Sequence, residues 1–350
     1  MAPFTDWPHL RQAFTKGERF AVAGERLDAA LVRIAGGTDA CWAVDDAGTP
    51  IVDHDPDRAL RPASTLKMVT AAAALLRLGP DHRFTTAALS DGSGAPRGLV
   101  LVGGGDPGLA TPKGIAAVAG DPERRGAPTT ALADLARRIE ETGVRALPDG
   151  IRVDDTRYDT VRYVDAWPDS YRATGQVGPV GALTVDGGWN DPAGRRDTPP
   201  DPAIASGQAL ARLLEARGIR VGPVTRGSAP AGARTVATVQ SAPLREVVAG
   251  ILASSDNHGA EMLLKEVAVD AGTRPGTTEA GARAARRALE RAGVGTDGIV
   301  QLDGSGLARD DRASCRTLIE VLRLGDRPRL RALRDGLAVA GERGTLAPRL

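Results

Sequence analysis

The chain has 350 residues, and this length favours two or more folding units over a single compact domain. Its composition, with 42% hydrophobic and 25% charged residues, is ordinary for a globular protein. The 45 basic and 44 acidic side chains leave a formal net charge of +1, so neither a nucleic acid nor an anionic membrane is expected as a partner.

Neither a membrane span nor a secretory signal peptide is expected in this chain. No apolar stretch is long enough to span a bilayer, and the start, MAPFTDWPHLRQAFTKGERF, lacks a continuous apolar segment and a cleavage site. Cys41 and Cys315 allow one disulfide at most and do not have the spacing of metal ligands. Because Cys41 lies in the apolar run CWAV, we expect a small buried hydrophobic residue in preference to a disulfide.

The first predicted elements are a β-hairpin and a buried helix. Residues 39–57 hold two apolar runs around the sequence DDAG, which is typical of a hairpin. After Pro62, residues 64–77 are rich in Ala and Leu, and Gly79 and Pro80 then end the helix. This helix is apolar on nearly every side, so we expect it at the centre of its domain.

Residues 83–238 differ from the rest of the chain because turn sequences such as GGGDPG are frequent in them. Short β-like runs at 98–104 and 150–155 alternate with amphipathic helices at about 129–143 and 203–217. This pattern predicts a separate α/β or α+β unit.

From residue 241 strong helix patterns return. Three helices are predicted, at 241–257, 259–272 and 277–293, and either Thr277 or Thr278 is expected to cap the last one.

Ser64 and Lys67 form an S-x-x-K pair in the first turn of the predicted buried helix. Residues i and i+3 share one helix face with Cβ atoms about 5–6 Å apart. The helix N-terminus favours a developing oxyanion, and an amine whose pKa is lowered by burial can take the hydroxyl proton, whereas arginine cannot. With 11 serines and four lysines, about 0.13 chance matches are expected. The other interpretation is a capping serine beside an exposed lysine.

A second polar group, Ser255-Asp256-Asn257, lies between two predicted helices. Alone, it would be interpreted as helix caps and turn residues. Together, S-x-x-K and S-D-N are two of the three motifs, the third being K-T-G, of class A β-lactamases and penicillin-binding proteins.

The order of these motifs resembles the serine D-Ala-D-Ala carboxypeptidases of the S13 peptidase type, the class C low-molecular-mass penicillin-binding proteins. The resemblance extends over almost the whole chain. Its landmarks are RPASTLKMVTAAAAL, GGGDPGL (103–109), GPVGALTVDGG (178–188), SSDNHGAEMLLKEV (254–267), LDGSGLARDDRAS (302–314) and LAVAGERGTLAPRL (337–350). Class A β-lactamases are disfavoured, because 191 residues separate Ser64 from Ser255.

The resemblance implies an α/β (α+β) fold with a penicillin-binding/β-lactamase-like catalytic domain. Residues 1–82 and 239–350 would form this domain, and residues 83–238 would be inserted between the S-x-x-K and S-x-N motifs. Such a protein acts outside the cytoplasmic membrane, so a location in the cell envelope or a secreted form is implied.

The resemblance also implies a role for each site residue. Ser64 would be the nucleophile that forms an acyl-enzyme, and Lys67 would be the base. Ser255 would relay a proton to the leaving amine, and Asn257 would bind the substrate amide. The substrate would be a peptidoglycan stem peptide, which loses its terminal D-Ala or its cross-bridge. β-Lactams would act as inhibitors, and no metal or organic cofactor is implied.

Three neighbouring features have structural interpretations. Asp256 is expected to point away from the site, and His258 is expected to start a helix and not to act as a base. The sequence DGSG at 303–306 resembles a turn of the family in which the glycines set the backbone geometry near the site.

The third motif of the family, K-T-G, does not occur in the chain. Arg343-Gly344-Thr345 has a different order, and no lysine follows Lys265. We therefore expect a chain truncated before this motif, with little activity, because losing one oxyanion donor costs about 10²–10³ in rate. Two alternatives stay open: a non-catalytic protein that binds the cell wall, and a β-lactamase or esterase on the same fold.

Overall fold

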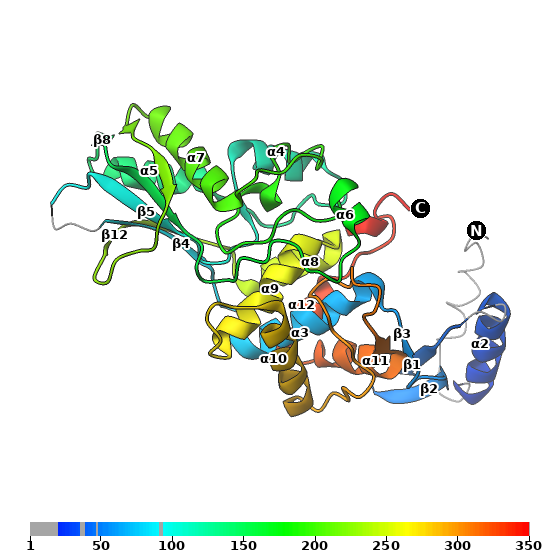
Figure 1. Cartoon of the computed structure of the whole chain (residues 1–350). Coiled ribbons are helices and arrows are strands. Elements are labelled where there is room, and N and C mark those ends of the chain that lie inside the picture. Colours follow the sequence, from blue (N-terminus) through cyan, green and yellow to red (C-terminus); the bar gives the residue numbers. More distant parts are fainter. Residues whose placement is uncertain (1–19, 36–38, 47, 91–93, 350) are drawn as a thin grey trace.

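The computed structural model of the chain describes residues 20–35, 39–46, 48–90 and 94–349. Residues 1–19, on which the expectation about a signal peptide depends and with which the predicted catalytic domain starts, lie outside these ranges. Within the described part, a mixed sheet with its helices lies at one end, a group of helices lies in the middle, and a β-hairpin beside a helix lies at the other end (Figure 1).

A five-stranded sheet of order β11-β9-β5-β4-β12 organises the first of these parts. β11, β9 and β5 run parallel, and β4 is antiparallel to both β5 and β12. α5 and α7 pack on one face over buried Leu, Ile and Val side chains (Figure 1). The elements are β4 (Thr85–Ser90), β5 (Gly98–Val102), β9 (Gly150–Asp154), β11 (Val224–Arg226), β12 (Arg234–Gln240), α5 (Leu132–Glu141) and α7 (Pro202–Glu215). The two strands and two helices predicted between residues 98 and 217 are confirmed.

Short elements lie between the strands and helices of this part along the chain. They are β6 (Leu109–Ala110), α4 (Pro112–Gly120), β7 (Thr130–Ala131), β8 (Ala146–Leu147), α6 (Asp169–Ala173), η3 (Asp186–Gly188) and β10 (Arg220–Val221). β6 pairs with β7 and β8 pairs with β10, both in parallel. The loops between them are long, and they carry one side of the site described below.

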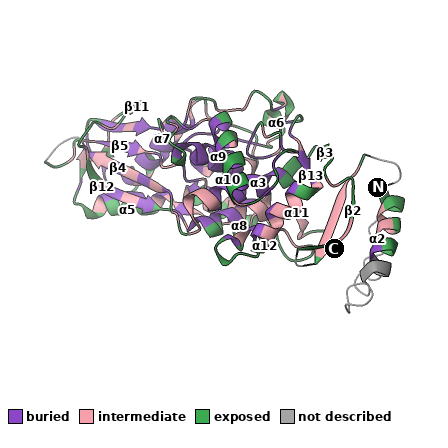
Figure 2. Cartoon of the chain, turned by 90° about the horizontal axis from the view of Figure 1, so that it is seen from below, coloured by how far each residue is buried: buried purple, intermediate pink, exposed green. Residues whose placement is uncertain are grey.

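The predicted central helix is α3 (Leu66–Leu78), preceded by the 3₁₀ turn η2 (Ala63–Thr65). Its first ten residues are all buried, because an Ala/Leu-rich helix has no polar face to turn to solvent. Figure 2 shows α3 surrounded by other helices. They are α8 (Leu244–Ser254), α9 (Asn257–Asp270), α10 (Thr278–Arg291), α11 (Cys315–Leu324) and α12 (Ala332–Asp335), with the 3₁₀ turns η4 (Pro328–Leu330) and η5 (Gly344–Leu346). Within the described ranges, no helix is both long enough and apolar enough to cross a membrane.

The three helices predicted after residue 241 correspond to α8, α9 and α10. Thr277 is the cap of α10, because its hydroxyl accepts a hydrogen bond from the N–H of Ala280 at 3.2 Å. A separate hydrophobic cluster joins α3 to α8, α9, α10 and α11. A third, smaller cluster joins segment 158–182 to α9 through residues such as Trp167 and Met262. The division at residues 83 and 238 into a catalytic and an inserted domain stays a prediction.

A disulfide ties the β-hairpin to the helical group. β1 (Trp42–Asp46) and β2 (Thr49–His54) pair antiparallel as predicted, and α2 (Phe20–Ala35) lies beside them (Figure 1). Cys41, just before β1, is bonded to Cys315, the first residue of α11 and 274 positions away. The expectation of a free buried thiol was wrong, because the apolar neighbours of Cys41 gave no sign of a partner so distant in sequence. β3 (Ala59–Leu60) and β13 (Ala313–Ser314) pair nearby.

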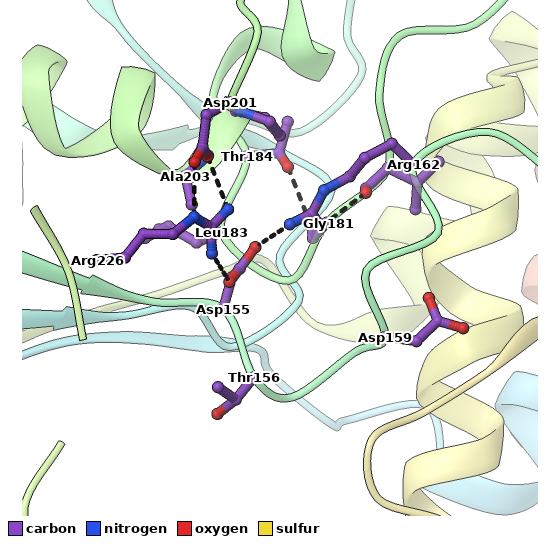
Figure 3. A network of polar contacts seen from close by, with 12 residues as sticks. Asp155, Thr156, Asp159, Arg162, Gly181, Leu183, Thr184, Asp201, Ala203 and Arg226 are labelled. Carbon is purple, nitrogen blue, oxygen red and sulfur yellow. Dashed lines mark hydrogen bonds and ion pairs between the residues drawn. The ribbon is translucent and has the colours of Figure 1, made fainter. Parts of the chain in front are cut away.

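A buried carboxylate fixes the loop that leads from the sheet toward the helices. Asp155, just after β9, accepts hydrogen bonds from Arg162 at 2.5 Å and Arg226 at 2.7 Å (Figure 3). Arg226 also pairs with Asp201, the N-cap of α7, at 2.6 Å, and Arg162 donates to the carbonyl of Val180 at 3.1 Å. The network therefore holds the segment around Val180 against the sheet. Each of the two guanidinium groups donates charge-assisted hydrogen bonds to two different residues.

Candidate active site

The four residues predicted from the sequence lie together where α3 begins. Ser64 in η2 is exposed, and its Oγ lies 3.2 Å from Nζ of Lys67. Ser255, at the C-terminal end of α8, donates its hydroxyl to Ser64 Oγ at 2.9 Å. Asn257, the first residue of α9, accepts from Lys67 through Oδ1 at 2.6 Å. Two motifs separated by most of the chain thus converge on one hydroxyl.

Lys67 is buried and fully hydrogen-bonded. Only 1% of its surface is exposed, and Nζ also donates to the carbonyl oxygen of Ser305 at 2.8 Å. Burial lowers the pKa of this amine to about 8, against the attraction of the Asp256 and Asp303 carboxylates, which favours the charged form. About a tenth of the molecules therefore carry a neutral Lys67 at neutral pH.

The backbone around the nucleophile adopts conformations that are rare outside glycine. Ala63 has φ +47° and Ser255 has φ +54°, both in the left-handed region. Such conformations cost about 1–3 kcal/mol each and persist only where the surroundings enforce them. Gly306 has φ +83°, and a Cβ at this position would lie 1.8 Å from the carbonyl oxygen of Ala63. Only glycine therefore allows this loop to press against the turn that carries Ser64.

The DGSG turn at 303–306 is held in shape by a buried carboxylate and anchors Lys67 through a main-chain carbonyl. Asp303 accepts hydrogen bonds from the N–H groups of Ser305 and Gly306 and from the indole N–H of Trp167. The sequence predicted the turn and its glycines, but not the contact from Lys67 to the Ser305 carbonyl. A main-chain acceptor carries no signal in the sequence. The Ser305 hydroxyl is fully buried and accepts from the N–H of Leu307 at 3.3 Å.

The site opens into a cleft of about 650 Å³. Its lining comes from two sides. Ser64 and residues 254–258 belong to the helical group, and residues 107–110, 127–129, 174–178 and 192–195 belong to the loops beside the sheet, together with Asp121, Glu123, Arg124, Asp186, Gly187 and Trp189. Asn257 bridges the two sides, because its Nδ2 donates to the carbonyl of Gln176 at 2.8 Å. One amide hydrogen of Asn257 remains available for a ligand carbonyl.

The sequence model of the D-Ala-D-Ala carboxypeptidase 3 (S13) family matches residues 26–198 and 193–350. The chain belongs to this family. A carboxypeptidase of Mycobacterium tuberculosis is 36% identical over 341 residues, which cover 95% of this chain and 70% of that protein.

Solved structures agree with the fold expected from the S13 resemblance. Penicillin-binding protein 4 from Haemophilus influenzae superposes with a TM-score of 0.74 at 20% identity, covering 92% of this chain and 83% of that one. A structure of the same protein complexed with a β-lactam superposes with a TM-score of 0.61 at 21% identity, covering 92% and 82%. The predicted α/β (α+β), penicillin-binding type of fold is confirmed.

Asp256 and His258 lie beside the predicted site residues. Asp256, which was expected to point away from the site, is one of the residues that line the cleft, and its side chain makes no capping hydrogen bond to α9. His258 is the second residue of α9, as expected for a helix start, and it is buried. Burial lowers the pKa of its imidazole. Among the described residues, no three His, Cys, Asp or Glu side chains gather as a metal site.

Proposed function

We propose that this protein is a serine-type D-Ala-D-Ala carboxypeptidase/endopeptidase, which hydrolyses peptidoglycan stem peptides through an acyl-enzyme on Ser64. The proposal is carried by one observation: Ser64 Oγ lies within hydrogen-bond distance of both the Lys67 amine and the Ser255 hydroxyl. Membership of the S13 family supports the substrate class and a location of the activity in the cell envelope.

The contacts of Lys67 determine where its lone pair would lie. Two of its three partners, the Asn257 and Ser305 carbonyl oxygens, can only accept hydrogen bonds. When the amine is neutral, its two remaining hydrogens stay on these acceptors and its lone pair faces Ser64 Oγ. Neutral Lys67 therefore accepts the Ser64 proton as Oγ attacks the carbonyl carbon of the penultimate D-Ala.

Ser255 completes the transfer to the leaving group. As the tetrahedral intermediate collapses, the C–N bond breaks and Ser255 gives its proton to the departing amine. Lys67 then returns the proton it took to the Ser255 oxygen, so that the Ser255 hydroxyl is restored. Water then attacks the ester on Ser64 with Lys67 again as the proton acceptor, and the shortened peptide leaves. The amide of Asn257 orients the substrate and holds the amine in place.

β-Lactams are expected to acylate the same hydroxyl, because their strained amide presents a carbonyl to Ser64 in the same way. The test is labelling with a fluorescent penicillin, followed by peptide mapping by mass spectrometry. Ser64→Ala should abolish the label, and Ser255→Ala should slow labelling about 100-fold or more. Ser254→Ala is the matched control, because the Ser254 hydroxyl donates to the Gly250 carbonyl inside α8. A label that persists in Ser64→Ala would refute the proposal.

A further inference from the structure

A buried glutamate on α9 holds the main chain beside Lys67. Glu261 lies one helical turn after Asn257 and is fully buried. Its Oε2 accepts a hydrogen bond from the N–H of Gly304 at 2.6 Å, and its Oε1 accepts from the Thr278 hydroxyl at 2.6 Å. Burying a carboxylate is costly unless it is hydrogen-bonded, and the reaction proposed above does not use this one. Its contact with the DGSG turn indicates what it does.

Thr70 on α3 holds the other main-chain group of Gly304. Thr70 lies one turn after Lys67 and is buried, and its hydroxyl donates to the Gly304 carbonyl at 2.7 Å. Gly304 is also pressed against α9, because a Cβ at this position would lie 2.5 Å from the Ala260 carbonyl oxygen. Two helices therefore hold the N–H and the carbonyl of one residue. We call Glu261, Thr70 and Gly304 together the Gly304 clamp.

The clamp acts on the carbonyl that follows it in the chain. The Ser305 carbonyl oxygen accepts a hydrogen bond from Lys67 Nζ at 2.8 Å. The peptide plane before Ser305 includes the Gly304 carbonyl, which the clamp holds, and the plane after it includes the Gly306 N–H, which donates to Asp303. Because peptide planes are rigid, these contacts leave the Ser305 carbonyl little freedom to turn away from the amine.

We propose that Glu261 and Thr70 are positioning residues that act through the clamp on the direction of the Lys67 lone pair. This inference rests on the proposed function. The carbonyl next to the clamp takes one hydrogen of the neutral amine, so the lone pair stays directed at Ser64. If this carbonyl turned away, the amine would be free to rotate and to donate a hydrogen to Ser64 Oγ. In that orientation it cannot accept the proton of the nucleophile.

The alternative is that the same contacts stabilise the fold and nothing more, and conservative substitutions separate the two roles. In Glu261→Gln the amide oxygen still accepts from the Gly304 N–H, and the amide nitrogen donates to the Thr278 hydroxyl, which can also accept. Glu261→Met removes the acceptor at similar size. On the other side of the clamp, Thr70→Ser keeps the donor and Thr70→Val removes it.

The test is stopped-flow acylation by a fluorescent penicillin, measured over a range of penicillin concentrations and pH. The rate constant at saturation reports the chemical step, and the half-saturating concentration reports the binding before it. We expect the saturating rate constant to fall about 10- to 100-fold in Glu261→Met and in Thr70→Val, since a displacement of about 1 Å can cost about 10²-fold. The half-saturating concentration should change by less than about 2-fold.

Two further readouts belong to the same experiment. The midpoint of the pH profile should move to lower pH in Glu261→Met and Thr70→Val, because a weaker acceptor stabilises the charged amine less. Glu261→Gln and Thr70→Ser should react within about 3-fold of the unsubstituted protein, because they keep the hydrogen bonds to Gly304. Glu266→Gln is the matched control for a buried carboxylate on the same helix, because Glu266 pairs with Arg157 and Tyr158 instead of the DGSG turn.

Two results would overturn the role of the clamp. One is an unchanged saturating rate constant in Thr70→Val, which decides alone if Glu261→Met does not fold. The other is a decrease in Glu261→Gln or in the Glu266→Gln control as large as that in Glu261→Met. A labelled unsubstituted protein whose folded variants react at unchanged rates refutes the clamp alone. An unlabelled unsubstituted protein refutes the proposed function and the inference that rests on it.

Discussion

Replacing Lys67 with arginine tests the proposed proton transfer most directly. Arginine keeps the positive charge at this position, and it can still donate to the Asn257 and Ser305 oxygens. It cannot lose a proton at any pH at which the protein is folded. Lys67→Arg therefore separates a base from an electrostatic anchor.

The expected decrease in the acylation rate of Lys67→Arg follows from the environment of the Lys67 amine. With a pKa of about 8, roughly a tenth of Lys67 is neutral at neutral pH, and this fraction sustains the reaction. General-base catalysis contributes about 10²–10⁴-fold, so we expect acylation of Ser64 to slow about 10³-fold in Lys67→Arg. In the unsubstituted protein, the acylation rate should rise about 10-fold per pH unit below the pKa of Lys67 and level off above it. The reason is that the neutral amine is the reactive form.

The assay is the second-order rate constant for acylation by a fluorescent penicillin, measured across this pH range. Lys113→Arg is the control, because Lys113 is exposed and contacts Asp191 and the Asn190 carbonyl at the surface. Lys67→Met, which removes the charge, should lose as much activity as Lys67→Arg. Thermal unfolding of each variant checks that the lower acylation rate does not result from an unfolded protein. Acylation by Lys67→Arg within a few-fold of the unsubstituted rate would refute the role of Lys67 as base.

Three further predictions concern stability. Asp155→Asn should lower the free energy of unfolding, measured by urea titration, by about 2 kcal/mol. This is less than the loss expected for a fully buried ion pair, because the side chain of Arg226 is 45% exposed. The control is Asp149→Asn in an exposed ion pair, which should change the free energy of unfolding by under about 0.5 kcal/mol. Burial raises the pKa of Glu261 from 4.5 to about 7, so the unfolded chain releases this proton first and stability should fall by up to about 3 kcal/mol as pH rises between these values. Glu261→Gln should remove that part of the pH dependence, and an unchanged slope in urea unfolding would contradict it. Cys41→Ser should lower the free energy of unfolding by about 2–5 kcal/mol, and no change relative to the oxidised protein would contradict the structural role of the disulfide.

The helices and the catalytic candidates could be predicted because their signals are local. The Ala/Leu run after Pro62 has no polar face, and burial follows from that composition alone. The S-x-x-K spacing places Ser64 and Lys67 on one face of a helical turn whatever the rest of the fold does. The alternation of apolar residues and the turn sequences were enough for β5 and β9.

The contacts that tune the site could not be predicted, because they join main-chain atoms and side chains from distant segments. The carbonyl of Ser305 and the carbonyl of Gln176 hold Lys67 and Asn257, and every residue type has such a carbonyl. The partner of Cys41 is equally distant, and an apolar neighbourhood suits a thiol as well as a disulfide.

The sequence by itself determined which atoms could do the chemistry: a hydroxyl one helical turn from an amine, and a second Ser–Asn pair beside a helix start. Only the tertiary structure decided that these groups meet at one point and that burial lowers the pKa of Lys67. The physical reason is that spacing along a helix fixes local geometry, whereas desolvation and electrostatic coupling depend on which distant segments exclude water from the site.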